Sequence, residues 1–324
     1  MRIFFIGSQD PGHEVFKRFL TASRQNKSNI ELVGAISLDP APHEMWTDDI
    51  KATALEENIP TKTIRDHLTL DKGSTATINA EEYVDFIKEK KPDLIFVFGW
   101  RQIIGKKIRN IAQDGTIGIH YSLLPKYRGH APIPWAIIND EEYTGFSLFH
   151  LSQGVDCGDI LLQKKVRILE EDSIATLREK VNREAIKSVE DLISYIQDSD
   201  KLPAAHQQEE REATITAYRL PQHSKIDWSK SDREIYNLIR ASSKPYSGAY
   251  THLEGQKVVV WSAELIPSAP QYIGLPGQIL KIIKKDGIIV KTGENAVLIK
   301  QIQISEEADI ASNLLTDTRK SLGE

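Results

Sequence analysis

The sequence has a single cysteine, Cys157, among its 324 residues. One cysteine can form neither a disulfide within the chain nor a cysteine-rich zinc site. Chains with so few thiols are typical of a reducing compartment, so we expect a cytoplasmic protein. The composition therefore excludes both a disulfide-stapled scaffold and a structural zinc finger.

Long apolar runs are also missing. The apolar run near the N-terminus, 3–6, is followed at once by Gly7 and polar residues. Such a run is too short for the core of a signal peptide. No window approaches the ~18 consecutive apolar residues that mark a membrane-spanning helix. We therefore expect neither a secretory signal nor insertion into a membrane.

Basic residues are not in excess either. The chain has 41 Lys and Arg against 46 Asp and Glu, which gives a formal net charge of −5. Proteins that bind nucleic acid through its phosphates rely on a positive field, and this chain has none overall. The charge balance disfavours a nucleic-acid partner and favours a small-molecule substrate.

The first half of the chain alternates short apolar runs with amphipathic segments. We expect strands at 2–7, 30–36, 94–98 and 115–119, and helices at 13–23, 50–57 and 81–90. This alternation predicts an α/β fold with a doubly wound, Rossmann-like, mainly parallel sheet. Ligands of such sheets bind beyond the carboxyl ends of the strands. His120 follows directly on one expected strand, where a site is anticipated.

The pattern changes in the second half. A helix expected at 173–196 is followed by a polar stretch without apolar periodicity. Beyond it come a helix at 232–241 and several short strand-like runs, with a hairpin signal at Lys285-Asp286-Gly287. Short strands with close turns predict a small, OB-like β-barrel. We predict an N-terminal domain at 1–198, a linker at 199–213 and a C-terminal domain at 214–324.

Three segments carry the candidate chemistry. Gly118-Ile119-His120 leads into Ser122-Leu123-Leu124-Pro125, the segment 126–132 follows, and the segment 154–159 contains Asp156, 36 residues after His120. A histidine serves as a general base near neutral pH when a carboxylate orients it. From spacing alone, His120 is open to a catalytic role with Asp156 or to a structural role in the core.

The run IHYSLLPKYRGHAPIPWAI, followed by GVDCGDI, resembles the folate-dependent formyltransferases. That family includes methionyl-tRNA formyltransferase, the amino-sugar N-formyltransferases and glycinamide ribonucleotide transformylase. Past the expected linker, IDWSKSDREIYNLIRASSKPYSGAY is similar to the C-terminal domain of the methionyl-tRNA and aminoarabinose enzymes. The resemblance covers nearly the whole chain, and it implies a formyltransferase catalytic domain followed by the family's small C-terminal domain.

The resemblance implies transfer of a formyl group from the co-substrate 10-formyltetrahydrofolate to an amine, without a metal. The family's catalytic Asn, His and Asp fall on Gly118, His120 and Asp156. His120 is then expected to take or relay the amine proton, and Asp156 to orient it. The family Asn donates a hydrogen bond to the formyl oxygen, and Gly118 departs from this pattern. The loss of one such donor costs about 2.7–4 kcal/mol. A backbone N–H, an ordered water or protonated His120 are the candidate replacements.

The resemblance also implies binding residues. The expected cofactor-binding residues are Phe98, Gly99, Trp100, Ile103, Ser122, Leu123, Leu124, His130, Gly154 and Val155. The expected substrate-binding residues are Lys126, Tyr127 and Arg128. Trp100 is equally open to a role as a cap on the core, and Cys157 is expected to pack rather than react.

Local charge bears on which amine is formylated. The segment 39–49 has four acidic residues and no Lys or Arg, and 206–324 has 15 basic and 15 acidic residues. Because tRNA binding needs cations at its phosphates, we expect a small amine, namely a nucleotide-linked amino sugar. The oligomeric state stays open, with a homodimer as one candidate. Two alternatives stay open: a methionyl-tRNA formyltransferase, and a folate-binding protein whose catalysis is impaired by Gly118. A dinucleotide-binding dehydrogenase is disfavoured, because IGSQDPG lacks the G-x-G-x-x-G spacing.

Overall fold

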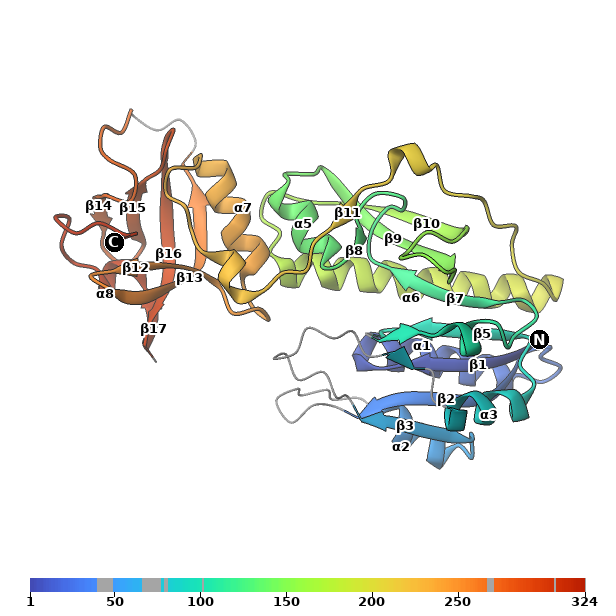
Figure 1. Cartoon of the computed structure of the whole chain (residues 1–324). Coiled ribbons are helices and arrows are strands. Elements are labelled where there is room, and N and C mark those ends of the chain that lie inside the picture. The colour runs from blue at the N-terminus through green and yellow to red at the C-terminus, as the bar shows by residue number, and fades with distance from the viewer. Residues whose placement is uncertain are drawn as a thin grey trace. The chain divides into compact units, whose positions relative to one another are not determined.

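The computed structural model describes residues 1–39, 49–65, 77–78, 81–100, 102–266, 271–305 and 307–323 (Figure 1). Most of the acidic segment 39–49 lies outside the described residues. The chain divides into two compact units. The first comprises Met1–Arg128, Gly145–Lys165 and Val181–Thr214, and the second Gly129–Thr144, Val166–Lys180 and Ile215–Glu324. The predicted domain boundaries at 198 and 214 remain predictions.

A seven-stranded sheet in the order β10-β9-β7-β5-β1-β2-β3 forms the centre of the first unit. The five strands from β7 to β3 run parallel, and β9 runs antiparallel to β7. The strands are β1 (Arg2–Gly7), β2 (Glu31–Asp39), β3 (Thr61–Arg65), β5 (Leu94–Phe98), β7 (Thr116–His120), β9 (Tyr143–His150) and β10 (Ile160–Arg167). Because parallel strands end at the same edge, the carboxyl ends of β1, β5 and β7 lie together there.

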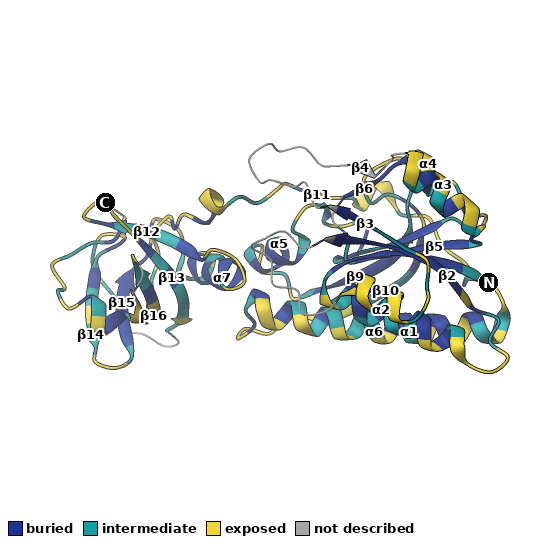
Figure 2. Ribbon diagram, turned by 90° about the horizontal axis from the view of Figure 1, so that it is seen from below, coloured by how far each residue is buried: buried dark blue, intermediate teal, exposed yellow. Residues whose placement is uncertain are grey.

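Helices cover both faces of this sheet, because β1 is apolar on both faces. Phe5 packs with Phe16 and Phe19 of helix α1 (Gln9–Arg24). Phe4, its neighbour in the strand, packs in a cluster with Val84 of α3 (Glu81–Lys90) on the other face. Figure 2 shows the strands buried and the helices with exposed outer faces. The predicted doubly wound sheet is confirmed.

A six-stranded antiparallel sheet forms the core of the second unit, in the order β12-β13-β16-β15-β14 with β17 paired to β16. The strands are β12 (Ala249–Leu253), β13 (Gln256–Leu265), β14 (Ile279–Ile283), β15 (Gly287–Lys291), β16 (Ala296–Ile304) and β17 (Glu307–Ile310). Helix α7 (Asp232–Ser242) packs on β13. A capping box of Ser231 and Glu234 starts this helix. The predicted small β domain is confirmed.

The remaining elements are the long helix α6 and several short helices and strands. They are α2 (Ile50–Glu56), β4 (Thr77–Ile78), β6 (Ile103–Ile104), α4 (Lys106–Arg109), β8 (Arg128–Gly129), α5 (Pro132–Ile138), α6 (Ile174–Ser199), η1 (Glu210–Glu212), β11 (Ile215–Thr216), η2 (Pro221–Ser224) and α8 (Ala311–Leu314). The expected helix at 13–23 begins earlier, at Gln9, since Pro11 fits the first turn of a helix. The expected strand at 115–119 is shifted by one residue and takes in His120.

Candidate active site

His120 is the last residue of β7, paired across the sheet with Ser147 of β9. Only 8% of the residue is exposed. Its Nε2 lies 2.7 Å from the carbonyl oxygen of Tyr127. A carbonyl can only accept a hydrogen bond, so Nε2 carries a proton and donates it. The loop after β7 thereby fixes both the rotation and the tautomer of the ring.

Asp156 faces the other ring nitrogen. Its Oδ2 lies 3.4 Å from Nδ1 of His120, and its side chain is 22% exposed. The backbone of Asp156 adopts a left-handed conformation, with φ of 50°. Aspartate tolerates this region better than most residues. The tight turn at this position therefore directs the carboxylate towards the imidazole.

These two contacts define where a proton can be exchanged. With Nε2 already protonated, Nδ1 attracts the carboxylate only when it carries a proton as well. Proton exchange at His120 therefore takes place at Nδ1, the ring nitrogen that faces Oδ2. Their separation is longer than the 2.7–2.9 Å or so of a short charge-assisted hydrogen bond. A movement of about half an ångström would bring the pair to that distance.

Gly118 lies on the same face of β7 as His120, two residues earlier. A Cβ atom at this position would lie 2.7 Å from Cδ2 of Leu151. Leu151 packs against the neighbouring hydrophobic clusters and occupies the space that a side chain at 118 would need. An apolar side chain thus fills the position at which the resemblance implies an asparagine.

The loop after His120 is held by its own hydrogen bonds. The Ser122 hydroxyl donates to the Lys126 carbonyl at 2.6 Å, and Ser147 donates to the Ser122 carbonyl at 2.8 Å. Leu124 is buried in a cluster with Phe149. Ser122 and Leu124 are therefore built into the protein, and Leu123 is partly exposed.

The three expected substrate-binding residues differ in exposure. Lys126 is exposed, Tyr127 is partly buried, and only 4% of Arg128 is exposed. The Arg128 guanidinium makes two hydrogen bonds to the carboxylate of Glu210, at 3.0 and 2.9 Å. These bonds hold the pKa of Glu210 below its ordinary value. The structure thus commits several Arg128 donors to acceptors within the protein.

The expected cofactor loop follows β5. Phe98 is fully buried, Gly99 has φ of 68°, and Ile103 is 49% exposed. Trp100 packs partly against the core, as the alternative role expects. Its buried Nε1 has no hydrogen-bond acceptor among the described residues. A bound ligand with an acceptor atom would satisfy this donor, so Trp100 fits a polar heterocycle.

The other expected cofactor residues lie elsewhere. Gly154 is exposed and Val155 is 66% exposed, both in the turn that leads to Asp156. His130 belongs to the second unit, where its ring packs edge-on against Tyr218 at 5.1 Å. The first unit therefore brings together the β5 and β7 loops and the Asp156 turn. His130 is described with the second unit alone.

The sequence reading missed three groups beside this site. They are Gln208, which bonds to the Asp156 turn, Leu151, and the Tyr127 carbonyl that holds His120. Gln208 stands in a polar stretch with no apolar periodicity, and backbone carbonyls carry no signal in the sequence at all. For Leu151 the sequence did hold a signal: a glycine at 118 leaves room beside the strand that a neighbouring side chain must fill.

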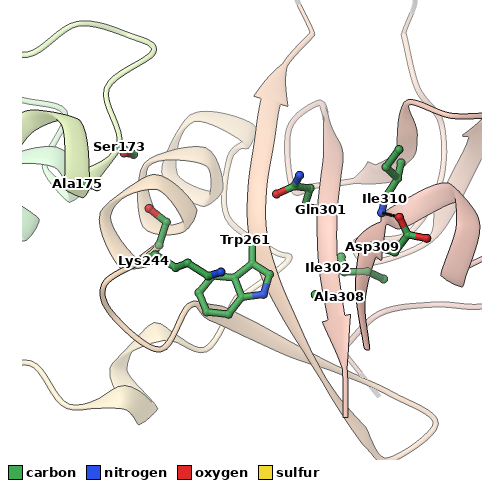
Figure 3. Close-up of a pocket in the computed structure, with 10 residues that line it drawn as sticks. Ser173, Ala175, Lys244, Trp261, Gln301, Ile302, Ala308, Asp309 and Ile310 are labelled. Atoms are coloured by element: carbon green, nitrogen blue, oxygen red, sulfur yellow. Dashed lines mark hydrogen bonds between the residues drawn. The ribbon is translucent and has the colours of Figure 1, made fainter. Parts of the chain in front are cut away.

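The second unit contains a separate cleft of about 450 Å³ (Figure 3). Lys244 lies with its ammonium 5.3 Å from the centre of the Trp261 ring. Asp309 is the only acidic residue and Lys244 the only basic residue among those that line the cleft. The lining thus has no excess of positive charge.

Within the described ranges, no group of three or more His, Cys, Asp or Glu side chains is placed to hold a metal ion. None of the helices there combines the length and apolar character that crossing a membrane requires.

Two family models match the chain. The formyl transferase model covers residues 1–192, and the model of the formyl transferase C-terminal domain covers residues 220–316. The methionyl-tRNA formyltransferase of Halothermothrix orenii is 33% identical over 258 residues, which are 78% of this chain and 80% of that protein. The corresponding protein of Alkaliphilus oremlandii is 34% identical over 284 residues, or 86% of each chain.

Solved structures share the fold. The N-formyltransferase of Helicobacter canadensis, in complex with folinic acid and dTDP-3-aminofucose, superposes with a TM-score of 0.67. It is 17% identical, over 92% of this chain and 98% of that one. The family models and the sequence relatives confirm what the motifs around His120 and Asp156 predicted: the chain belongs to the formyl transferase family.

Proposed function

We propose that the protein transfers a formyl group from 10-formyltetrahydrofolate to the primary amine of a small substrate, a nucleotide-linked amino sugar. The observation that carries this proposal is the pairing of His120 and Asp156 at the carboxyl end of β7, with Nδ1 and Oδ2 3.4 Å apart. Ligands of doubly wound sheets bind at this edge. The same two residues are those that the family resemblance implies as catalytic.

The pair supplies acid–base chemistry that formyl transfer needs. The amine loses one proton as it becomes an amide, and the leaving nitrogen gains one. A single group that takes a proton and returns it serves both steps. Nδ1 of His120 is that group, because Nε2 is already protonated and bonded to the Tyr127 carbonyl. Asp156 stabilises the imidazolium that forms when Nδ1 is protonated.

The loop after β5 has features that suit the co-substrate. When bound, 10-formyltetrahydrofolate supplies the formyl carbon. The Trp100 indole N–H is buried and lacks an acceptor among the described residues, and the Ile103 side chain, three residues later, is half exposed. A pterin offers both hydrogen-bond acceptors and a flat apolar face. Trp100 and Ile103 are therefore the residues we expect to contact it.

Charge supports the choice of a small amine. The stretch 206–324 has equal numbers of basic and acidic residues, and the lining of the described cleft in the second unit is balanced as well. A protein that contacts many tRNA phosphates would need a clear excess of Lys and Arg. The Helicobacter canadensis neighbour, which was solved in complex with dTDP-3-aminofucose, supports an amino sugar as the acceptor.

Methionyl-tRNA is the second candidate acceptor. The observation in its favour is that the sequence relatives described above carry the name methionyl-tRNA formyltransferase, at 33% and 34% identity. The alignment with them covers more than two thirds of this chain. The two candidates differ in salt dependence, because each phosphate contact to tRNA makes binding weaker as salt rises.

A panel assay with purified protein distinguishes these candidates. The protein is supplied with 10-formyltetrahydrofolate and either methionyl-tRNA or nucleotide amino sugars that include dTDP-3-aminofucose. We expect formylation of an amino sugar to be faster and almost independent of salt. Faster formylation of methionyl-tRNA, with a steep loss of rate at higher salt, would establish the second candidate. Folate binding without turnover on any amine would show that catalysis has been lost.

A further inference from the structure

A polar segment beside the site, residues 206–214, is bonded at both of its ends within the first unit. At one end His206 and Ile160 exchange two backbone hydrogen bonds, at 2.8 and 3.0 Å. At the other end the Thr214 hydroxyl accepts from the Tyr127 amide at 2.8 Å, and the Thr214 carbonyl accepts from the Arg128 amide at 2.9 Å. We call residues 206–214 the strap. It joins the start of β10 to the loop whose carbonyl holds His120.

Gln208 is the residue of the strap that reaches the Asp156 turn. Its Nε2 donates to the Asp156 carbonyl at 2.8 Å and to the Gly158 carbonyl at 2.7 Å. Two carbonyls of one turn thus share a single amide group. The turn benefits from such support, because Asp156 has a left-handed φ, which residues with a side chain adopt less readily than glycine. No side chain fits at Gly158, where a Cβ would overlap the His150 carbonyl.

Arg128 fixes the orientation of the Gln208 amide. Its Nε and one terminal nitrogen donate to Oε1 of Gln208, at 3.1 and 2.9 Å. Since Oε1 faces only donors and Nε2 faces only carbonyls, a flipped amide would lose all four bonds. Arg128 is in turn held by the bidentate pair with Glu210. The chain of contacts runs from Glu210 through Arg128 and Gln208 to the Asp156 turn.

We infer that Gln208 is a positioning residue for the catalytic pair. It sets the separation of Asp156 from His120, and Arg128 acts through it. One segment, the strap, governs both members: the Tyr127 loop that orients His120 and the turn that carries Asp156. This inference rests on the proposed role of Asp156, since a residue that positions Asp156 matters for the rate only if Asp156 does.

The test uses Gln208→Met, which keeps the volume of the side chain and removes both donors, together with Gln208→Glu, which keeps its shape. Gln207→Met and Gln207→Glu are the matched controls, because Gln207 is the exposed neighbour in the same strap. Formyl transfer is measured with 10-formyltetrahydrofolate and either dTDP-3-aminofucose or methionyl-tRNA, whichever the protein formylates faster. Binding of tetrahydrofolate and the melting temperature are measured beside the rate.

Both Gln208 variants should lower kcat by about 10- to 100-fold, the effect of misplacing a catalytic group by about 1 Å. The KM for the co-substrate and the affinity for tetrahydrofolate should not change. In the Asp156→Asn background, Gln208→Met should cause no further loss, because residues that act through one another are not additive. The ¹⁵N signal of the His120 imidazole, assigned by its absence in His120→Ala, should shift in the Gln208 variants and not in the Gln207 controls.

The inference is overturned if Gln208→Met keeps the rate of the Gln207 controls, or if its effect adds in full to that of Asp156→Asn. A loss of rate that is matched by loss of tetrahydrofolate binding would also overturn it, since that is the mark of a general structural role. The proposed function fails in a different way, namely if His120→Ala and Asp156→Asn themselves keep full rate.

Discussion

The substitution Gly118→Asn restores the residue that the family resemblance implies, and the structure predicts that it will not fit by itself. A Cβ at position 118 would lie 2.7 Å from Cδ2 of Leu151, whereas carbon atoms in contact prefer about 3.5–4.0 Å. Leu151 must therefore move by roughly 1 Å. Overpacking of this kind costs about 1–3 kcal/mol. Because Leu151 is partly exposed and its side chain is flexible, we expect the low end of that range.

The assay combines stability and rate in a double-mutant cycle. For a compact unit of about 150–250 residues, a loss of about 1 kcal/mol lowers the melting temperature by about 2–4 °C. Gly118→Asn should show that loss and no gain in rate, because Leu151 holds the space its amide needs. Gly118→Asn with Leu151→Ala should recover stability relative to the sum of the single variants. It should also raise the formyl-transfer rate, by up to about 10²-fold if the new amide reaches the developing charge.

Two outcomes would refute this reasoning. If Gly118→Asn melts at the wild-type temperature, Leu151 does not occupy the space beside position 118. If the losses of stability from the two substitutions simply add, the side chains at 118 and 151 are not in contact. Leu151→Ala alone is the control for the packing that is lost when the leucine is removed.

Further predictions concern stability and pH. Burial holds the pKa of His150 below its ordinary value, so the unfolded chain takes up the proton first as pH falls. Neutral, buried His150 therefore contributes stability that is fully present above about pH 6.5 and declines as the pH falls below it. His150→Gln should flatten this decline, as measured by the melting temperature between about pH 5.5 and 7.5. Loss of the capping box in Ser231→Ala should cost about 0.5–2 kcal/mol, seen in melting curves as a lower transition temperature, whereas the exposed Ser247→Ala should cause no change.

Much of the fold followed from apolar periodicity. The helix expected at 81–90 and the strands expected at 2–7 and 94–98 have those bounds in the structure. The strands β9 and β10 were not predicted. They extend the sheet beyond β7, and β10 has two buried residues followed by an alternation of partly buried and exposed ones. Helix α5 was missed as well, since two prolines in PIPWAII mask its helical character.

The site was predictable where a side chain itself carries the chemistry. His120 and Asp156 could be named from their motifs, and the structure places Nδ1 and Oδ2 3.4 Å apart. The proton on Nε2 could not be foreseen, because it depends on a backbone carbonyl brought near by the turn of the loop. The contact of Gln208 with the Asp156 turn joins residues that are 52 positions apart in the chain. The periodicity of neighbouring residues does not predict contacts between positions so far apart.

The formyl-transfer rate of Asp156→Asn and His120→Ala, measured with tetrahydrofolate affinity, tests the central claim most directly. Asp198→Asn, an exposed aspartate on α6, serves as the control. The account predicts that both catalytic variants lose about 10²- to 10⁴-fold in rate while tetrahydrofolate affinity stays the same. If either variant keeps the rate of the Asp198→Asn control, the His120–Asp156 pair does not carry the reaction.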